Sequence, residues 1–413
     1  MRVKELKLQN FRAIKDLHLV FNPEYNVVVL VGINGIGKSS ILNCINLLVQ
    51  YYNLVLLQRN HRIMSGSGIF KFIQTSDVRT GASKSINQIK VNFGVQDTSW
   101  EIDEMSGSRD WDRTLARLSP DFFNQIENNR INIYNNTNIG LGHSYFYYLS
   151  NRQVKYFQKT LVDESSDIIN FESFSEWFKQ TEDLENEQRL SDNIDYRHPV
   201  LTVVRHAVYS LLGEGYNSLT FKRKTNKMII QKSGKEISID LLSDGEKSLL
   251  AMVSDLSRRL AESYQNLEAA ALVLIDEIEL HLHPEWQRVI IPRLTKTFPN
   301  CQFIVTTHSP QVLSHVDPEC IHILDYDGDN VIVKRPESSY GLDSNRILED
   351  ILGLSKRPQE IQDQMLELFR TINNNDLVSA KEIVRELGDR IGINEPELVK
   401  AEATIKRREI IGR

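Results

Sequence analysis

The strongest constraint on this chain is a glycine-rich loop that joins a predicted strand to a predicted helix. Residues 32–39 read Gly-Ile-Asn-Gly-Ile-Gly-Lys-Ser, the G-x-x-x-x-G-K-S pattern of a phosphate-binding loop. The apolar, β-branched run at residues 26–31 predicts a buried strand, and residues 40–48 have the apolar spacing of a helix. Strand, loop and helix in this order predict a nucleotide-binding site near the start of the chain.

Each residue of this loop has an expected task in binding a nucleotide. The glycines, Gly35 and Gly37 among them, let the backbone curl so that its N–H groups point at the phosphates, and the new helix adds the positive end of its dipole. We expect Lys38 to reach the β- and γ-phosphates and the hydroxyl of Ser39 to bind Mg²⁺. Two more residues of this segment are expected nucleotide contacts, Asn34 and Ser40.

Composition excludes several classes of protein. The chain has 413 residues, of which 41% are hydrophobic and 25% are charged, as in ordinary globular proteins. No apolar run approaches the roughly 18 residues of a membrane span, and the first residues lack a signal-peptide core, so we expect a cytoplasmic protein without a membrane partner. The net charge of −6 still permits a local basic groove for nucleic acid.

Two carboxylates follow a second predicted strand. Residues 272–275 are Leu-Val-Leu-Ile, and Asp276 and Glu277 come directly after them. In open α/β sheets, ligands bind at the carboxyl ends of the strands. We therefore expect Asp276 to hold Mg²⁺, directly or through water, and Glu277 to orient and deprotonate the water that attacks the nucleotide.

A second helix start provides a second anion site. Residues 241–247 read Leu-Leu-Ser-Asp-Gly-Glu-Lys and open a strong helical pattern. The N–H groups of such a helix start, together with Ser243 and Gly245, can bind a phosphate. An ordinary helix cap also accounts for the serine, but a cap alone does not require Gly245 next to Glu246.

One strand after the carboxylates, a histidine occupies a similar position. The segment 302–310 is an apolar run that ends in Thr-Thr-His-Ser-Pro. A lone histidine is most often structural. The position of His308 at the carboxyl end of a strand indicates instead that it hydrogen-bonds the γ-phosphate and the attacking water.

In this order, the phosphate loop, Leu-Ser-Asp-Gly-Glu, Ile-Asp-Glu and Thr-His-Ser resemble the ABC-type ATPases, in the branch of the SMC proteins, RecF and the OLD-family nucleases. The resemblance covers residues 1–60 and 235–330. It implies an α/β P-loop ABC-ATPase head with a mixed β-sheet, flanking helices and an antiparallel β lobe. It also implies a head-to-tail homodimer, or a higher homo-oligomer, in which ATP lies between residues 32–39 of one head and Ser243–Gly245 of the other.

On this basis the chain divides into four expected parts. Residues 1–154 are the N-terminal ATPase lobe with the phosphate loop, and residues 214–340 are the C-terminal lobe with the other motifs. Residues 155–213 are an acidic helical insert, too short for long coiled-coil arms. Within it, residues 161–200 hold eleven Asp and Glu against three Lys and Arg, and a charge run of this kind is usually a solvated face. Residues 341–413 are a helical tail, which is a candidate for binding a partner.

The insert and the tail resemble a narrower family. Residues 174–186 and 277–287 resemble segments of defence-associated ATPases of the OLD and PtuA type. Residues 340–348 and 395–399 resemble the helical end of PtuA, the ATPase subunit of Septu and of certain retron systems, whose nuclease is a separate HNH protein. The resemblance implies an ATPase that dimerises on ATP and regulates an HNH nuclease subunit of the PtuB type in anti-phage defence.

Local patterns predict several further elements. Alternating residues predict a hairpin of strands 3–9 and 15–21, and a second hairpin that turns at Thr225-Asn226. The second hairpin is basic, which indicates either nucleic-acid binding or a strand edge protected by lysines. Apolar spacing predicts four helices in the tail, over residues 343–352, 359–371, 377–387 and 395–411.

Two site residues and two functions remain as alternatives. Gln153 is a candidate for the loop that links the metal to the insert, and Arg12 for a phosphate-side contact, although a solvated side chain is the simpler interpretation of both. One alternative function is a RecF- or SMC-like DNA-repair ATPase, which duplex DNA would stimulate strongly. The other is an OLD-like nuclease, which would cleave DNA by itself. The tail is too short for the Toprim domain of that class, and a transporter ATPase is a more distant alternative.

Overall fold

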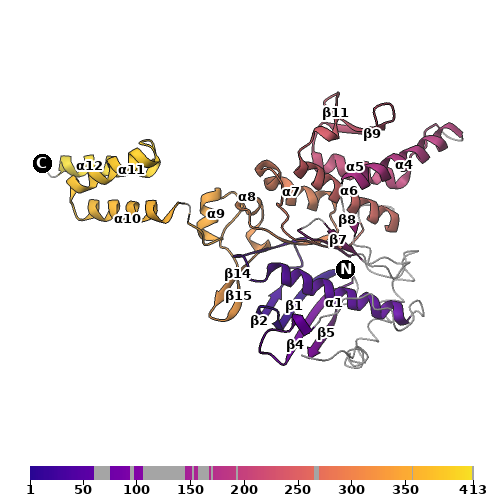
Figure 1. Cartoon of the computed structure of the whole chain (residues 1–413), viewed down its shortest axis with the longest axis horizontal. Helices are drawn as coiled ribbons and strands as arrows, with labels where there is room; N and C mark the ends of the chain where they lie inside the picture. Colours follow the sequence, from indigo (N-terminus) through magenta and orange to yellow (C-terminus); the bar gives the residue numbers. More distant parts are fainter. Residues whose placement is uncertain are drawn as a thin grey trace. The chain divides into compact units, whose positions relative to one another are not determined.

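The computed structural model describes most of the chain, and the described residues form two compact units, Met1–Ile347 and Leu348–Arg413 (Figure 1). The first unit contains β-sheets with helices packed on them, and the second is helical. The described residues are 1–59, 75–93, 97–105, 145–150, 153–156, 167–168, 171–191, 194–264, 269–355 and 357–411.

A mixed eight-stranded sheet forms the centre of the first unit. Its order is β15-β14-β3-β13-β12-β6-β7-β8, and the strands from β14 to β6 run parallel. The apolar runs before the three polar motifs form β3, β12 and β13, in which every residue is buried. Because these strands are parallel neighbours, the polar residues after them meet at one edge of the sheet. The strands are β3 (Val27–Val31), β6 (Tyr145–Tyr148), β7 (Gln153–Tyr156), β8 (Asp167–Ile168), β12 (Leu272–Ile275), β13 (Gln302–Thr306), β14 (Ile321–Asp327) and β15 (Asn330–Lys334).

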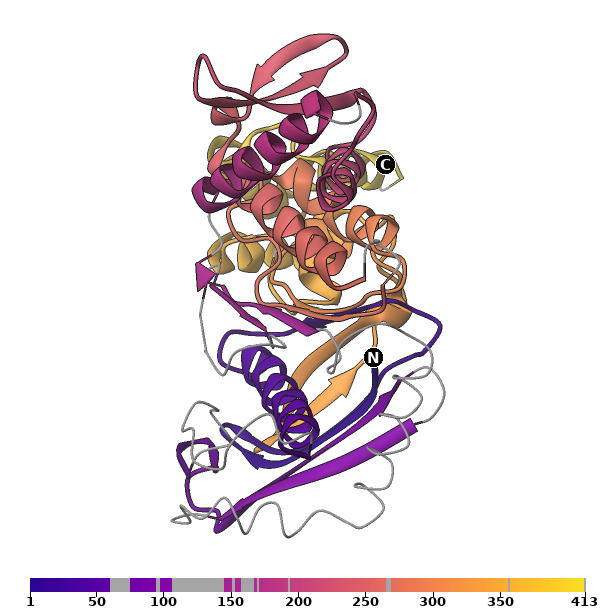
Figure 2. The ribbon, with the colours of Figure 1, turned by 90° about the vertical axis from the view of Figure 1, so that its right-hand side faces the viewer.

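A four-stranded antiparallel sheet in the order β2-β1-β4-β5 covers helix α1 (Lys38–Arg59). The predicted hairpin over residues 3–9 and 15–21 is confirmed, because β1 and β2 pair antiparallel. Leu6 of β1, Ile45 of α1 and Ile304 of β13 belong to one buried cluster, so α1 packs between this sheet and the central one (Figure 2). The strands are β1 (Arg2–Phe11), β2 (Ile14–Val20), β4 (Lys84–Asn92) and β5 (Asp97–Met105).

Helices α4 to α7 lie on the side of the central sheet opposite α1 (Figures 1 and 2). A three-stranded sheet, β11-β10-β9, packs on them through a cluster that includes Phe178, Leu250 and Ile230. The predicted hairpin that turns at Thr225-Asn226 is confirmed as β9 and β10. These elements are α4 (Phe171–Ser191), α5 (Pro199–Leu212), α6 (Asp244–Tyr264), α7 (Pro284–Thr297), β9 (Tyr216–Lys222), β10 (Lys227–Lys232) and β11 (Lys235–Ser238).

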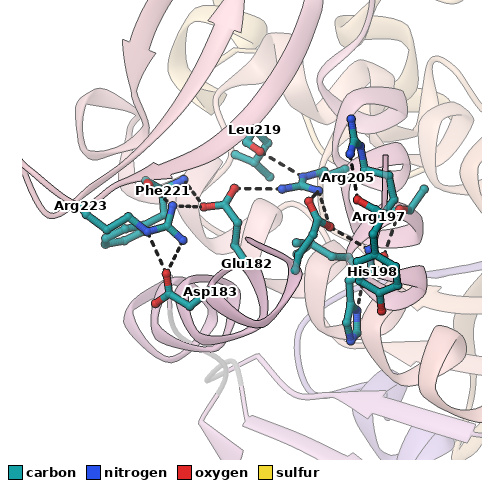
Figure 3. Close-up of polar contacts among 12 residues, drawn as sticks. Glu182, Asp183, Arg197, His198, Arg205, Leu219, Phe221 and Arg223 are labelled. Carbon is teal, nitrogen blue, oxygen red and sulfur yellow. Dashed lines mark hydrogen bonds and ion pairs between the residues drawn. The ribbon is translucent and has the colours of Figure 1, made fainter. Parts of the chain in front are cut away.

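The acidic insert is not a uniformly solvated face. The side chains of Glu182 and Glu185 on α4 are only 4% and 3% exposed. Arg205 of α5 donates to both carboxylates at 2.9 Å, and Arg223 donates to Glu182 at 2.6 Å (Figure 3). The interpretation of the whole acidic run as solvated is therefore wrong at these two glutamates. Buried carboxylates need such partners, and the tertiary fold brings both arginines from outside the run.

The second unit consists of α10 (Gln359–Asn373), α11 (Leu377–Ile391) and α12 (Pro396–Ile411), which pack through a common buried cluster. The helices predicted for the tail are confirmed at these positions. Helix α9 (Ser344–Asp350) corresponds to the first of them and crosses the boundary between the units. Within the described residues, we find no helix with the length and apolar character that crossing a membrane requires.

Candidate functional site

The phosphate loop joins β3 to α1 in a conformation that its glycines permit. Gly37 has a φ of +110°, which L side chains rarely adopt, and it comes just before the first residue of α1. A Cβ on Gly32 would lie 2.6 Å from the carbonyl oxygen of Leu324 on β14. The loop is therefore packed against a neighbouring strand at one end and turns sharply into the helix at the other.

Lys38 lies inside this loop, with only 6% of the residue exposed. Its Nζ donates to the carbonyl oxygens of Gly32 and Ile33, each at 2.9 Å. Burial lowers the pKa of Lys38, while the carboxylates that follow β12 oppose this shift. The loop thus holds a cation at the point where phosphates would bind. Two other predicted contacts, Asn34 and Gly35, are exposed, and Ser40 is half-buried.

A hydroxyl–carboxylate cluster lies beside the loop. The Oγ of Ser39 donates to Oδ1 of Asp276 at 3.0 Å, although 237 residues separate the two in sequence. The Oγ1 of Thr306 donates to the same oxygen at 2.7 Å, and the backbone N–H of Asp276 donates to the carbonyl of Tyr148 at 2.9 Å. Ser39 and Asp276 offer the hard oxygen donors that Mg²⁺ prefers, so the residues present fit this ion.

Thr306 is a residue of this cluster that the sequence interpretation missed. It is the last residue of β13 and is completely buried. Its Oγ1 donates to Asp276 and also accepts the backbone N–H of Glu277 at 2.8 Å. A polar residue at the end of an otherwise apolar strand, one strand away from two carboxylates, is the signal that could have found it.

Glu277 has an unusual backbone and an open carboxylate. Its φ is +50°, a conformation that costs a non-glycine residue about 1–3 kcal/mol and is concentrated at functional sites. The hydrogen bond from its N–H to Thr306 supports this conformation. Among the described residues, none donates a hydrogen bond to the carboxylate of Glu277, which is half-buried. Its oxygens are therefore available to accept a hydrogen bond from water.

His308 follows β13 and faces the same edge of the sheet. Its backbone N–H donates to Oε1 of Glu279 at 2.6 Å. Burial lowers the pKa of His308, and the nearby charge of Lys38 lowers it further, so the ring is neutral at pH 7. Sequence reasoning did not assign Glu279, although it comes two residues after Glu277. The structure identifies it as the carboxylate that holds the backbone at His308.

The second predicted anion site, at the start of α6, is built from a different set of contacts. Ser243 is exposed, and its amide and hydroxyl both donate to Oε2 of Glu246 at 2.8 Å. A Cβ on Gly245 would lie 1.9 Å from the carbonyl oxygen of His281, in the segment after Glu277. Close packing within the chain thus explains the glycine. Among the described residues, no hydrogen bond joins Ser243 to the phosphate loop.

The two remaining candidates are in different surroundings. The Nε of Arg12 donates to Oδ1 of Asp77 at 2.8 Å, and its N–H donates to the carbonyl of Asp77 at 2.7 Å. Arg12 is therefore held by an ion pair with Asp77. Gln153 begins β7 and pairs with Ile168 of β8 rather than lying in a loop. Its side chain lies outside the described residues, so its metal-binding role stays a prediction.

Two family descriptions match the chain. Residues 107–314 match the family described as "AAA domain, putative AbiEii toxin, Type IV TA system". Residues 1–198 match the family described as "AAA ATPase domain". Together the two matches cover residues 1–314, which include the phosphate loop and His308.

Known proteins resemble the chain over most of its length. It is 27% identical to "Retron Ec83 probable ATPase" of Escherichia coli, over 99% of this chain and 87% of the relative. It is 26% identical to "Septu protein PtuA" of Bacillus thuringiensis, over 86% of this chain and 85% of that protein. The solved structure "SMC head domain from Thermotoga maritima" aligns with 82% of this chain and 100% of its own, at 17% identity and a TM-score of 0.44. The first relative covers nearly the whole chain, so the likeness includes the insert and the tail.

Proposed function

Because the chain belongs to the family of AAA-domain ATPases that its residues 107–314 match, we propose that it couples ATP hydrolysis to the control of a partner nuclease in anti-phage defence. ATP hydrolysis is the activity of the family. The defence role is supported by the relatives named for a retron and for Septu, which match most of the chain. The partner is proposed to be an HNH-type nuclease, and the helical tail is the segment proposed to bind it.

One observation carries the proposed chemistry: Ser39, Asp276 and Thr306 share a hydrogen-bonded cluster beside Lys38. In this proposal, Lys38 and the loop N–H groups bind the phosphates. Ser39 and Asp276 would hold Mg²⁺, which would offset the charge of the phosphates. The carboxyl group of Asp276 accepts hydrogen bonds from two hydroxyls, which fix its orientation before any ligand arrives.

We propose that half-buried residues at the same edge of the sheet orient and deprotonate the water that attacks the γ-phosphate. The open carboxylate of Glu277 accepts a hydrogen bond from the water and then takes its proton. His308, which is neutral because burial lowers its pKa, donates a hydrogen bond to the γ-phosphate. Thr306 keeps Glu277 in its strained conformation through the 2.8 Å hydrogen bond to its N–H.

The active unit is proposed to be a head-to-tail dimer. Ser243 is exposed and makes no hydrogen bond to the phosphate loop of its own chain among the described residues. A second copy would bring Ser243 and the N–H groups at the start of α6 to the γ-phosphate held by Lys38. ATP would then join the two heads, and hydrolysis would separate them.

The three-stranded sheet β9–β11 and its turns carry exposed lysines that could contact nucleic acid. Its exposed lysines include Lys224, Lys232 and Lys235. Two neighbours are already paired, because Lys222 contacts Glu236 and Lys227 lies 3.7 Å from Asp240. This sheet is therefore the surface proposed to contact nucleic acid, through fewer cations than the sequence alone suggests.

Substitution of the proposed base tests the function. Glu277→Gln is expected to bind ATP, to hydrolyse it at least about a hundredfold more slowly, and to accumulate as ATP-dependent dimers. Turnover is measured by phosphate release and dimers by light scattering after size-exclusion chromatography. Glu285→Gln is the matched control, since Glu285 is an exposed carboxylate in the first turn of α7. Near-normal turnover of Glu277→Gln would exclude this residue as the base.

A further inference from the structure

The start of α6 contains a carboxylate that the proposed mechanism does not use. Oε2 of Glu246 accepts from both the amide and the hydroxyl of Ser243, each at 2.8 Å. In return, the backbone N–H of Glu246 donates to Oγ of Ser243 at 3.3 Å. The two residues thus hold each other in a capping box, and the position of Oγ is set by bonds on two sides.

The other oxygen of Glu246 is held by a tryptophan from the next helix. Nε1 of Trp286 donates to Oε1 of Glu246 at 3.1 Å. Burial alone would raise the pKa of Glu246, but the hydrogen bonds from Ser243 and Trp286 outweigh it and hold the pKa below its ordinary value. The group is therefore an ionised carboxylate at neutral pH, with defined donors on both oxygens.

Trp286 itself has little freedom to move. The guanidinium of Arg293 lies over its ring at 4.9 Å from the centroid. Nη1 of Arg293 donates to the carbonyl oxygens of Leu211 and Leu212, at 2.6 and 3.1 Å, at the end of α5. Trp286 and Arg293 therefore connect Glu246 to the carboxyl end of α5. A residue that only caps a helix does not need this connection.

We propose that Glu246 is a positioning residue that, fixed by Trp286, holds the Oγ of Ser243 in place for the γ-phosphate bound by a second copy of this chain. This inference rests on the proposed dimeric function. In the single chain, the hydroxyl hydrogen of Ser243 is directed to Glu246. When a phosphate arrives, only a rotation about the Cβ–Oγ bond redirects it, since Oγ stays bonded to the N–H of Glu246. The site is therefore ready before the heads meet.

A double-mutant cycle tests whether Glu246 acts through Ser243. We expect Glu246→Ala to lower ATP turnover and ATP-dependent dimerisation about tenfold, and Ser243→Ala at least as much. The double variant should be no worse than Ser243→Ala, because coupled residues are not additive. The affinity of the single chain for ATP should not change, since that site is built around Lys38. Glu246→Gln keeps one acceptor oxygen and should recover part of the activity.

Two further variants separate positioning from folding. Trp286→Phe keeps an aromatic ring at this position but removes the N–H donor to Oε1, and we expect about threefold lower turnover. Asp376→Ala removes a helix cap of α11, where the carboxylate accepts the N–H of Ser379 at 3.2 Å. It should lower the Tm as a lost cap does, with turnover of the isolated chain unchanged.

The outcomes distinguish this inference from the function on which it rests. Full activity of Ser243→Ala would overturn the proposed dimeric site and this inference with it. If Ser243→Ala is impaired but Glu246→Ala and Trp286→Phe turn over ATP normally, the positioning role alone is overturned. Additive losses in the double variant would also overturn it, since Glu246 would then act apart from Ser243. If Glu246→Ala lowered the ATP affinity of the single chain as much as it lowers turnover, the positioning role would also be overturned.

Discussion

The chain contains two helix starts suited to an anion, and they are built in opposite ways. At the start of α1, the loop encloses Lys38, which is 6% exposed, and Asp276 accepts the hydroxyl of Ser39 from another part of the sequence. At the start of α6, Ser243 is exposed and donates to Glu246, three residues along the same helix. The first start is enclosed by distant segments. At the second, the serine hydroxyl is exposed, and a residue of the same helix accepts its hydrogen bond.

This difference shows which site can act alone. A binding site surrounded by its own chain can hold a ligand without help, because its cation and its dipoles are already oriented. An exposed helix start has only its N–H groups and one hydroxyl to offer, so its affinity for a phosphate in water is small. We infer that the site at the start of α1 binds the nucleotide by itself. The site at the start of α6 binds the phosphate only when another surface holds the nucleotide against it.

The largest expected effect separates the two helix starts directly. Lys38→Ala should abolish ATP binding by the single chain and lower turnover by about a hundredfold or more, because a preorganised charge is lost. Ser243→Ala should leave that binding intact and lower turnover by about tenfold or more, as for the loss of a hydrogen bond to a charged group. Calorimetry with ATP and phosphate release measure the two quantities. Equal loss of ATP binding in both variants would contradict the division of roles.

The next effect tests why a glycine is the second residue of α6. Gly245→Ala places a Cβ about 1.9 Å from the carbonyl of His281, so backbone must move, and we expect the free energy of unfolding to fall by about 1–3 kcal/mol. Gly388→Ala on α11 is the matched control. There the Cβ would meet the Cγ2 methyl of Ile393 at 3.2 Å, so this side chain must shift by only a few tenths of an ångström, and the helix gains from alanine. Urea denaturation that ranks the two variants equally would refute the packing explanation.

The smallest expected effect concerns pH. Burial lowers the pKa of His308 below its ordinary 6.5, so the unfolded chain binds a proton there more readily than the folded chain. The free energy of unfolding should therefore fall as the pH drops below about 6.5. His308→Gln should reduce the slope of the unfolding free energy against pH by less than the contribution of one proton. Burial also lowers the pKa of His322, but this residue contributes equally in both proteins. Identical slopes between pH 5 and 7 would show that His308 titrates normally.

Most of the fold was predictable because local patterns encode it. The apolar runs that became β3, β12 and β13 had the length and the β-branched residues of buried strands, and every residue of the three strands is buried. The tail helices were predicted within a few residues of their observed ends, since apolar spacing at the helical period is a strong signal. The roles of Lys38 and Glu277 remain predictions, although both lie at the edge of the sheet where their motifs indicated.

What sequence reasoning missed depends on contacts between distant segments. The acidic run was interpreted as a solvated face, but Glu182 is buried because Arg205 and Arg223 come from elsewhere to pair with it. Thr306 was not assigned, because a threonine at the end of a strand has no distinctive pattern until its neighbour is known. In both cases the local sequence is compatible with several environments, and packing selects one of them.

The sequence by itself therefore determined the nucleotide chemistry of this protein, since the phosphate loop needs only the local backbone conformations that its glycines allow. It also determined most of the order of strands and helices, because hydrophobic periodicity is a property of neighbouring residues. The prediction of a wholly helical insert over residues 155–213 was wrong at β8 (Asp167–Ile168), which pairs with β7. Only the tertiary structure decided that Asp276 meets Ser39 and that Gly245 must leave space for His281. The physical reason is that these contacts depend on how distant strands and helices pack, which no local pattern specifies.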